Sequence, residues 1–335
     1  MESILLSNQV DKLYSVYNEK ILNEIEKHTI IKKDICFTKD DLFNNKEAFK
    51  NVKYIFSSWG MVTLNKEEVR DIFPNLKHIF YGAGSVQYFA KPFMDNQVLI
   101  HSAYLANAIP VAQFTLSQIM LSNKNYFLNS IEHTKGNIEK AYSIRNKVLG
   151  NYNSKIGILG AGAIGSKVIE YLNAMGNFEI YVFDPFLSDT RALELQVIKS
   201  DLSTIFKNCN IISNHLADND QTKGILDYKF FSLMPDYSTF INTGRGAQVI
   251  ENDLVRALEE NPTLFALLDV TYPEPPKEDS LLYSRKNILI SSHIAGALAN
   301  EHQRMSEYMY NDFLAVLKNQ EPKYIITKKM LETMA

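Results

Sequence analysis

Residues 155–165 read Lys-Ile-Gly-Ile-Leu-Gly-Ala-Gly-Ala-Ile-Gly, a short apolar run that leads directly into a glycine-rich turn. The run predicts a buried strand, and the apolar residues of 163–175 recur at helical spacing. A GxGxxG pattern between a strand and a helix is typical of a dinucleotide-binding turn. We expect Gly160 to allow the tight turn, Gly162 to let the backbone approach a pyrophosphate, and Gly165 to let the helix pack closely on the strand.

The residues around this turn predict which dinucleotide binds. The phosphates should lie at the N-terminus of the helix, where Ala163 and Ile164 present backbone N–H groups. A second strand, 179–184, ends in Asp184. A carboxylate at this position accepts hydrogen bonds from the adenine-ribose hydroxyls and repels a 2′-phosphate. The expected cofactor is therefore NAD and not NADP.

Three later apolar runs are each followed by a side chain suited to catalysis: 239–242 by Arg245, 264–270 by Glu274 and 287–291 by His293. In an open parallel sheet, ligands bind at the carboxyl ends of the strands. A cation, a carboxylate and an imidazole brought to that edge would converge on one crevice. This combination predicts a hydride-transfer site. His215 also follows a strand and could lie near the cofactor, but His293 is the one histidine predicted to be catalytic.

Composition and charge exclude several classes of protein. The chain has 335 residues, which is too long for one ordinary core and fits two domains. Apolar residues make up 46% and charged residues 22%, the ordinary range of globular proteins. The net charge of −3 and the lack of a Lys or Arg run argue against a nucleic-acid partner. The apolar stretches are too short for a membrane span.

The two cysteines predict a reducing compartment. Cys36 and Cys209 are far apart in sequence, form no CxxC pair and accompany no secretory signal. We therefore expect a cytoplasmic protein, and we expect no metal site.

The order of the elements predicts an α/β fold. Strand-like runs 3–6, 54–57, 78–81 and 98–101 alternate with helical patterns, and a long helix is expected over 111–129. Six strands at βα spacing follow, at 155–159, 179–184, 210–215, 239–243, 264–270 and 287–291. They predict a doubly wound parallel-sheet (Rossmann) cofactor domain, residues 106–299. A helix at 300–318 has no strand left to cover there. We expect it to cross back to a smaller flavodoxin-like α/β substrate domain, 1–105 and 300–335, with a cleft between the two domains.

Six segments in this order resemble the D-2-hydroxyacid dehydrogenases, the group that includes D-lactate, glycerate and D-3-phosphoglycerate dehydrogenases. They are Gly82–Gly84, Asn107–Gln113, the glycine turn with Asp184, Ile241–Gly246, Leu268–Val270 with Glu274–Pro275, and His293–Gly296. The resemblance covers nearly the whole chain.

The resemblance implies a role for each candidate catalytic residue. Arg245 looks like the substrate arginine, which grips the carboxylate and polarises the keto oxygen. His293 looks like the general acid and base, and Glu274 would bond its far ring nitrogen and favour the imidazolium. Taken alone, each residue also has a structural interpretation: a surface ion pair, a solvated turn residue or a satisfied histidine. The joint pattern favours catalysis.

Four further positions are implied in binding. Asp269 resembles the aspartate near the nicotinamide carboxamide, and Thr243 should touch the cofactor through its main chain. The backbone amides of Ala83 and Gly84 should hold the substrate carboxylate.

Three departures from the family pattern bear on the substrate. Gln113 stands where Glu is usual, Ser292 where Pro commonly precedes the histidine, and Ser57-Ser-Trp-Gly60 replaces an Arg/Ser-containing loop. A phosphorylated substrate would require additional cations, and only Lys91 and His78 are candidates. An unphosphorylated acid is therefore favoured.

The resulting hypothesis is an NAD-dependent oxidoreductase that interconverts a small 2-keto acid and a D-2-hydroxy acid. The alternative is an NADH-sensing, corepressor-like binding module of the same fold, which would keep the same three catalytic residues. The sequence leaves open which acid is used and in which direction. Apolar residues spread around much of the helix Val111–Leu128, and together with the resemblance they predict a homodimer.

Overall fold

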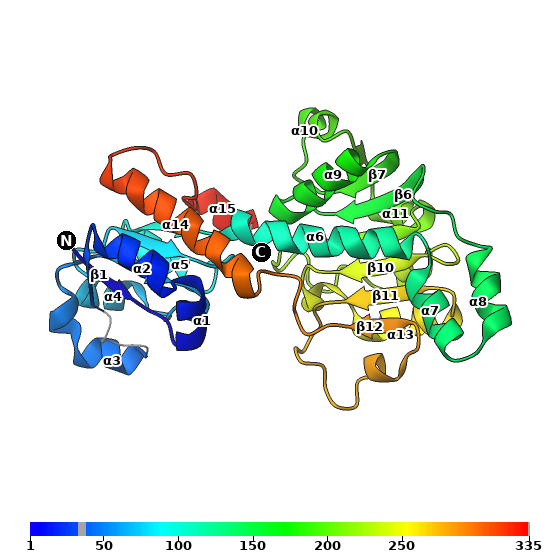
Figure 1. Ribbon diagram of the computed structural model, residues 1–335, viewed down its shortest axis with the longest axis horizontal. Coiled ribbons are helices and arrows are strands. Elements are labelled where there is room, and N and C mark those ends of the chain that lie inside the picture. Colours follow the sequence, from blue (N-terminus) through cyan, green and yellow to red (C-terminus); the bar gives the residue numbers. More distant parts are fainter. Residues whose placement is uncertain (33–37, 334–335) are drawn as a thin grey trace. The chain divides into compact units, whose positions relative to one another are not determined.

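The chain divides into two compact units in a computed structural model that describes residues 1–32 and 38–333. Of the described residues, the first unit contains Met1–Asn107 and 297–333, and the second contains Ala108–Gly296 (Figure 1). Cys36 lies outside the described residues. Cys209 is buried with a free thiol, and burial raises the pKa of that thiol to about 12.

A five-stranded parallel sheet forms the centre of the first unit, in the order β2-β1-β3-β4-β5. This is the flavodoxin-like order. The strands are β1 (Glu2–Leu5), β2 (Ile30–Lys32), β3 (Val52–Ser57), β4 (His78–Tyr81) and β5 (Leu99–Ser102). The helices are α1 (Val10–Val16), α2 (Glu19–Glu26), α3 (Lys39–Asn44), α4 (Lys66–Ile72), α5 (Ala90–Asp95), α14 (His302–Leu317) and α15 (Lys328–Thr333), with 3₁₀ turns at Lys46–Phe49 and Ala299–Glu301.

Helix α14 contributes to the core of this unit although it comes late in the sequence. Met305, Met309 and Phe313 are fully buried in the same cluster as the strands. The ring of Phe313 makes edge contacts with Phe56 and Phe80, with centroids 5.2 and 5.4 Å away. These aromatic contacts fix α14 on the sheet.

A seven-stranded parallel sheet forms the centre of the second unit, in the order β12-β11-β10-β9-β6-β7-β8. The strands are β6 (Ser154–Leu159), β7 (Phe178–Phe183), β8 (Ile198–Lys199), β9 (Ile211–Asn214), β10 (Thr239–Asn242), β11 (Phe265–Leu268) and β12 (Ile288–Ile290). The strand order reverses between β6 and β9. In such a sheet, the ligand crevice lies at the carboxyl ends beside that reversal.

The helices of the second unit cover both faces of this sheet. They are α6 (Tyr104–Ser122, which begins in the first unit), α7 (Tyr126–Thr134), α8 (Ile138–Arg145), α9 (Ala163–Met175), α10 (Asp189–Glu194), α11 (Leu202–Asn208), α12 (Tyr228–Phe231) and α13 (Glu251–Glu260), with 3₁₀ turns at Gly246–Gln248 and Leu281–Ser284. In β10, Phe240 packs in the core with α11, α12 and α13, whereas Ile241 packs in the core with α6 and α9. Successive residues of a strand point to opposite faces, so both must be apolar. The predicted α/β fold class with parallel sheets is confirmed.

Two details of the prediction are wrong. The helix expected over 111–129 is broken between α6 and α7, where Asn125 has a left-handed backbone with φ 48°. Asparagine adopts this conformation more readily than most residues. The short strands β2 and β8 were not predicted, because two or three residues cannot show a periodic pattern and both residues of β8 are exposed.

Candidate active site

The glycine turn after β6 has a different geometric requirement at each glycine. Gly160 has φ 89°, and a Cβ there would lie 2.6 Å from the carbonyl oxygen of His215. A Cβ on Gly165 would lie 1.9 Å from the carbonyl oxygen of Gly160. A Cβ on Gly162, in contrast, would meet nothing within 4 Å. The space beside Gly162 at the start of α9 therefore fits a pyrophosphate that approaches the backbone.

Asp184 is held at the carboxyl end of β7 by two backbone amides. The N–H of Ala161 donates to Oδ2 and the N–H of Phe186 donates to Oδ1, both at 2.8 Å. Each carboxylate oxygen retains a second lone pair. The carboxylate is thus oriented beside the glycine turn and can still accept a hydrogen bond from a hydroxyl group.

The loop after β10 places Arg245. Asn242 Oδ1 accepts the N–H of Gly244, and Asn242 Nδ2 donates to the carbonyl of Arg245, both at 3.1 Å. A Cβ on Gly246 would lie 2.0 Å from the carbonyl carbon of Thr271, so only glycine lets this loop pack against the segment after β11. The Arg245 side chain is about one third exposed.

Asp269, at the end of β11, clamps the loop that carries the histidine. Its Oδ1 accepts from the Ile294 N–H at 2.9 Å and from Ser291 Oγ at 2.6 Å, and its Oδ2 accepts from the Ala295 N–H at 2.9 Å. Its own carbonyl accepts from the His293 N–H at 3.0 Å. Sequence reasoning missed this contact, because a hydrogen bond between the loops of two neighbouring strands leaves no local pattern in the sequence.

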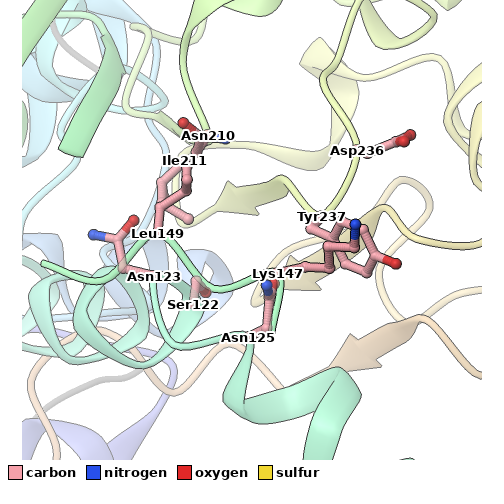
Figure 2. Close-up of a pocket in the computed structure, with 9 residues that line it drawn as sticks. All are labelled: Ser122, Asn123, Asn125, Lys147, Leu149, Asn210, Ile211, Asp236 and Tyr237. Carbon is pink, nitrogen blue, oxygen red and sulfur yellow. The ribbon is translucent and has the colours of Figure 1, made fainter. Parts of the chain in front are cut away.

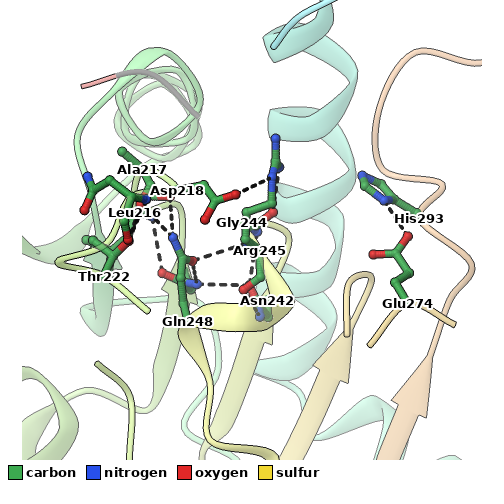
Figure 3. A network of polar contacts seen from close by, with 12 residues as sticks. Leu216, Ala217, Asp218, Thr222, Asn242, Gly244, Arg245, Gln248, Glu274 and His293 are labelled. Carbon is green, nitrogen blue, oxygen red and sulfur yellow. Dashed lines mark hydrogen bonds and ion pairs between the residues drawn. The ribbon is translucent and has the colours of Figure 1, made fainter. Parts of the chain in front are cut away.

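His293 forms a pair with Glu274. The distance from His293 Nδ1 to Glu274 Oε1 is 2.7 Å, and both side chains are about half exposed (Figure 3). The backbone of His293 is left-handed, with φ 57°. Residues other than glycine adopt this conformation infrequently, and the hydrogen bonds from Asp269 to the loop hold His293 there. Because β10, β11 and β12 are adjacent, Arg245, Asp269 and His293 all follow the same edge of the sheet.

His215 and Thr243 belong to a buried polar chain. Thr243 Oγ1 lies 3.0 Å from Thr115 Oγ1 and 3.4 Å from His215 Nδ1, and Ser213 Oγ lies 2.9 Å from His215 Nε2. Burial lowers the pKa of His215 to about 3, so the ring is neutral near pH 7. His215 therefore lies beside the glycine turn but is unsuited to act as a general acid.

The loop after β4 presents two backbone amides in the first unit. Ser102 Oγ donates to the carbonyls of Ala83 and Gly84 at 2.9 and 2.7 Å, which fixes the loop. Within residues 1–32 and 38–333, no acceptor pairs with the N–H of Ala83 or of Gly84. Two adjacent free amides on a fixed loop are suited to bind an anion.

A cavity of about 150 Å³ lies at the opposite, amino edge of the second sheet (Figure 2). It is lined by Ser122, Asn123, Asn125, Lys147, Leu149, Asn210, Ile211, Asp236 and Tyr237. Asn210 immediately precedes β9, and Tyr237 precedes β10. This cavity is therefore separate from the edge that carries Arg245 and His293.

The described residues lack two kinds of feature. No cluster of three or more His, Cys, Asp or Glu side chains there is placed to hold a metal ion. No helix in that part of the chain combines the length and apolar character needed to cross a bilayer.

Residues 119–295, most of the second unit, match the model described as D-isomer specific 2-hydroxyacid dehydrogenase, NAD binding domain.

Curated relatives carry related names. Putative 2-hydroxyacid dehydrogenase YoaD of Bacillus subtilis is 37% identical over 143 residues, which are 42% of this chain and 40% of that protein. Putative 2-hydroxyacid dehydrogenase SH0752 of Staphylococcus haemolyticus is 29% identical over 266 residues, which are 78% of this chain and 82% of that protein. Other Staphylococcus relatives align over 53% of their length.

Solved structures share the fold. The NAD-complexed D-isomer specific 2-hydroxyacid dehydrogenase from Lactobacillus delbrueckii ssp. bulgaricus aligns with a TM-score of 0.75 and 18% identity, over 98% of this chain and 100% of that chain.

Proposed function

Because the chain belongs to the family of D-isomer specific 2-hydroxyacid dehydrogenases, we propose that it transfers hydride reversibly between NAD(H) and a small 2-keto acid or D-2-hydroxy acid. The predicted family, Rossmann-type fold, NAD cofactor and 2-hydroxyacid dehydrogenase class are confirmed. The substrate and the roles of individual residues belong to the proposal.

The pair of His293 and Glu274 carries this proposal. With Nδ1 bonded to Glu274 at 2.7 Å, the ring is oriented and Nε2 is left for the substrate. In reduction, Nε2 gives its proton to the carbonyl oxygen, and in oxidation the neutral ring takes the hydroxyl proton. Bound NADH supplies the hydride. Glu274 stabilises the imidazolium form of the ring by its negative charge.

Arg245 and the first-unit amides bind the substrate in this proposal. The guanidinium grips the carboxylate and polarises the keto oxygen, and the free N–H groups of Ala83 and Gly84 provide the second hold on the carboxylate. The first unit is thus the substrate domain and the second the cofactor domain. In this proposal Asp184 binds the ribose, Thr243 contacts the cofactor through its main chain, and Asp269 lies near the nicotinamide carboxamide.

The substrate is proposed to be unphosphorylated because the two candidate cations are not available. Burial, together with the neighbouring charges of His101 and Lys77, lowers the pKa of His78 to about 4, so its ring is neutral near pH 7. Lys91 is paired with Asp95 at 2.7 Å. Neither supplies a free charge for a phosphate.

A screen of small 2-keto acids, followed by the loss of NADH absorbance, tests the function. Turnover of at least one acid that disappears in His293→Ala is the expected result. If NADH binds tightly but no acid is turned over, the corepressor-like binding module becomes the better description.

We propose a homodimer that forms through the second unit. On α6, Val111 and Ile119 are buried, but Leu121 is 40% exposed, and Tyr126 and Tyr142 on the next two helices are each 50% exposed. Large apolar side chains on neighbouring helices suit a subunit interface. Sedimentation at micromolar concentration should give about twice 38.3 kDa, and a species at 38.3 kDa would refute the dimer. The cytoplasmic location stays a prediction.

A further inference from the structure

Three buried carboxamides surround the backbone of the Arg245 loop. Asn214, Asn242 and Gln248 are each at most 1% exposed. Asn214 Nδ2 donates to Asn242 Oδ1 at 3.0 Å and to Gln248 Oε1 at 2.6 Å, which joins the three side chains. Gln248 Oε1 also accepts the Arg245 N–H at 3.3 Å, and Asn242 Nδ2 donates to the Arg245 carbonyl at 3.1 Å. Both polar backbone groups of Arg245 are therefore held by side chains.

Gln248 uses its whole hydrogen-bonding capacity. Its Oε1 accepts two bonds, from Asn214 and Arg245, and its Nε2 donates to the carbonyls of Leu216 and Ala217, both at 2.9 Å (Figure 3). An apolar side chain would fill a fully buried position without any desolvation cost. A glutamine that makes all four hydrogen bonds instead holds the backbone of Arg245 at a fixed distance from the backbone of Leu216 and Ala217.

The second of these segments leads directly to an acidic residue that faces Arg245. Asp218 follows Ala217, and its Oδ2 lies 3.8 Å from Arg245 Nε. Arg245 Nη1 also donates to the carbonyl of Gly244 at 2.9 Å. The guanidinium is thus hydrogen-bonded through Nη1 and lies within ion-pair distance of Asp218 at Nε, and in the described part of the chain its other N–H groups have no hydrogen-bond partner.

We propose that Asp218 orients the Arg245 guanidinium for the substrate. In this proposal Gln248 is a positioning residue that keeps the side chains of Asp218 and Arg245 close together. This inference rests on the proposed function, because it assigns Arg245 to the substrate. Glu274 lies 2.7 Å from the His293 ring, and Asp218 lies 3.8 Å from the Arg245 guanidinium. Each of these two side chains then has its own carboxylate. Gln248 acts through Arg245 and Asp218 and does not itself touch the substrate.

The first test is Asp218→Asn, with Asp220→Asn as the matched control. Asp220 lies in the same loop and pairs with Lys223 at 2.7 Å. Because the Asp218 pair is partly exposed, Asp218→Asn should lower kcat/KM by about two- to fivefold and leave the melting temperature unchanged. Asp220→Asn should leave kcat/KM unchanged. Equal values for Asp218→Asn and the wild type would overturn the role of Asp218.

The second test is a double-mutant cycle with Gln248→Glu. Glutamate keeps the length and the acceptor but loses the two donors to the Leu216 and Ala217 carbonyls. We expect kcat/KM to fall by about tenfold or more, and Asp218→Asn to have no further effect in this variant. Fully additive losses would overturn the link between Gln248 and the ion pair. If Gln248→Glu does not fold, Gln248→Met takes its place in the cycle, and failure of both would make Gln248 a structural residue only.

A spectroscopic readout separates this inference from the proposed function. In protein containing isotopically labelled arginine, the Nε–H resonance of Arg245, assigned by its loss in Arg245→Lys, should move in Asp218→Asn and stay in place in Asp220→Asn. The resonance needs no substrate. A wild-type chain without turnover therefore refutes the proposed function, whereas an unmoved resonance refutes the orienting role of Asp218.

Discussion

Alanine at Gly162 and alanine at Gly165 should separate cofactor binding from folding, although both positions belong to one turn. The Cβ of Gly162→Ala would meet nothing within 4 Å, so the free protein can accept it without rearrangement. The Cβ of Gly165→Ala would lie 1.9 Å from the carbonyl oxygen of Gly160. A backbone carbonyl cannot rotate away as a flexible side chain can, and the whole of α9 must move from β6.

The magnitudes follow from these contacts. Overpacking of this kind costs about 1–3 kcal/mol, and the rigid backbone places Gly165→Ala near 2–3 kcal/mol. For a unit of this size, that loss lowers the melting temperature by roughly 4–12 °C. Gly162→Ala should change the free energy of unfolding by less than about 0.5 kcal/mol, because reduced freedom of the unfolded chain offsets the weaker helix cap.

The methyl group of Gly162→Ala would occupy the space through which the pyrophosphate approaches the backbone. Losing one hydrogen bond to a charged group weakens NADH binding by about 10- to 150-fold.

Two measurements on each variant distinguish an effect on NADH binding from an effect on stability. Thermal unfolding by circular dichroism reports stability, and NADH fluorescence titration reports affinity. The expected result is a stable Gly162→Ala that binds NADH weakly and a destabilised Gly165→Ala. Wild-type NADH affinity in Gly162→Ala, or equal destabilisation of both variants, would refute the assignment of the turn.

Three further changes test other parts of the site. We expect the wild type to prefer NADH over NADPH by about 2–4 kcal/mol, and Asp184→Ala should reduce this preference. Equal use of both cofactors by the wild type would contradict the role of Asp184. His293→Ala should lower kcat by about 10²–10⁴ while the dissociation constant of NADH stays nearly constant, and wild-type turnover would exclude this residue as the acid. His215 has its pKa lowered by burial from 6.5 to about 3, so between these values the unfolded chain binds a proton that the folded chain does not. Stability is therefore lost as the pH falls. Between pH 6.5 and pH 4.5, His215→Gln should lose about 2–3 kcal/mol less free energy of unfolding than the wild type, as measured by urea unfolding. An unchanged pH dependence would contradict a buried neutral ring.

Local pattern was sufficient for much of the fold. The strand and helix on either side of Gly160–Gly165 each depend on apolar periodicity within a few residues, and so do most of the longer strands. The break after Ser122 escaped prediction because a left-handed residue at Asn125 interrupts a pattern that is apolar on both sides. The strand β8 was not predicted because it is two exposed residues at the edge of the sheet, beside β7.

The sequence by itself determined which chemical groups stand at the ends of the strands. Arg245, Glu274 and His293 were predicted as site residues because each follows an apolar run. Only the tertiary structure decided what holds them. Gln248 contacts a loop more than thirty residues earlier in the chain, and Asp269 clamps a loop more than twenty residues later. Such contacts depend on which strands become neighbours, and hydrogen bonds between distant loops leave no periodic trace in the sequence.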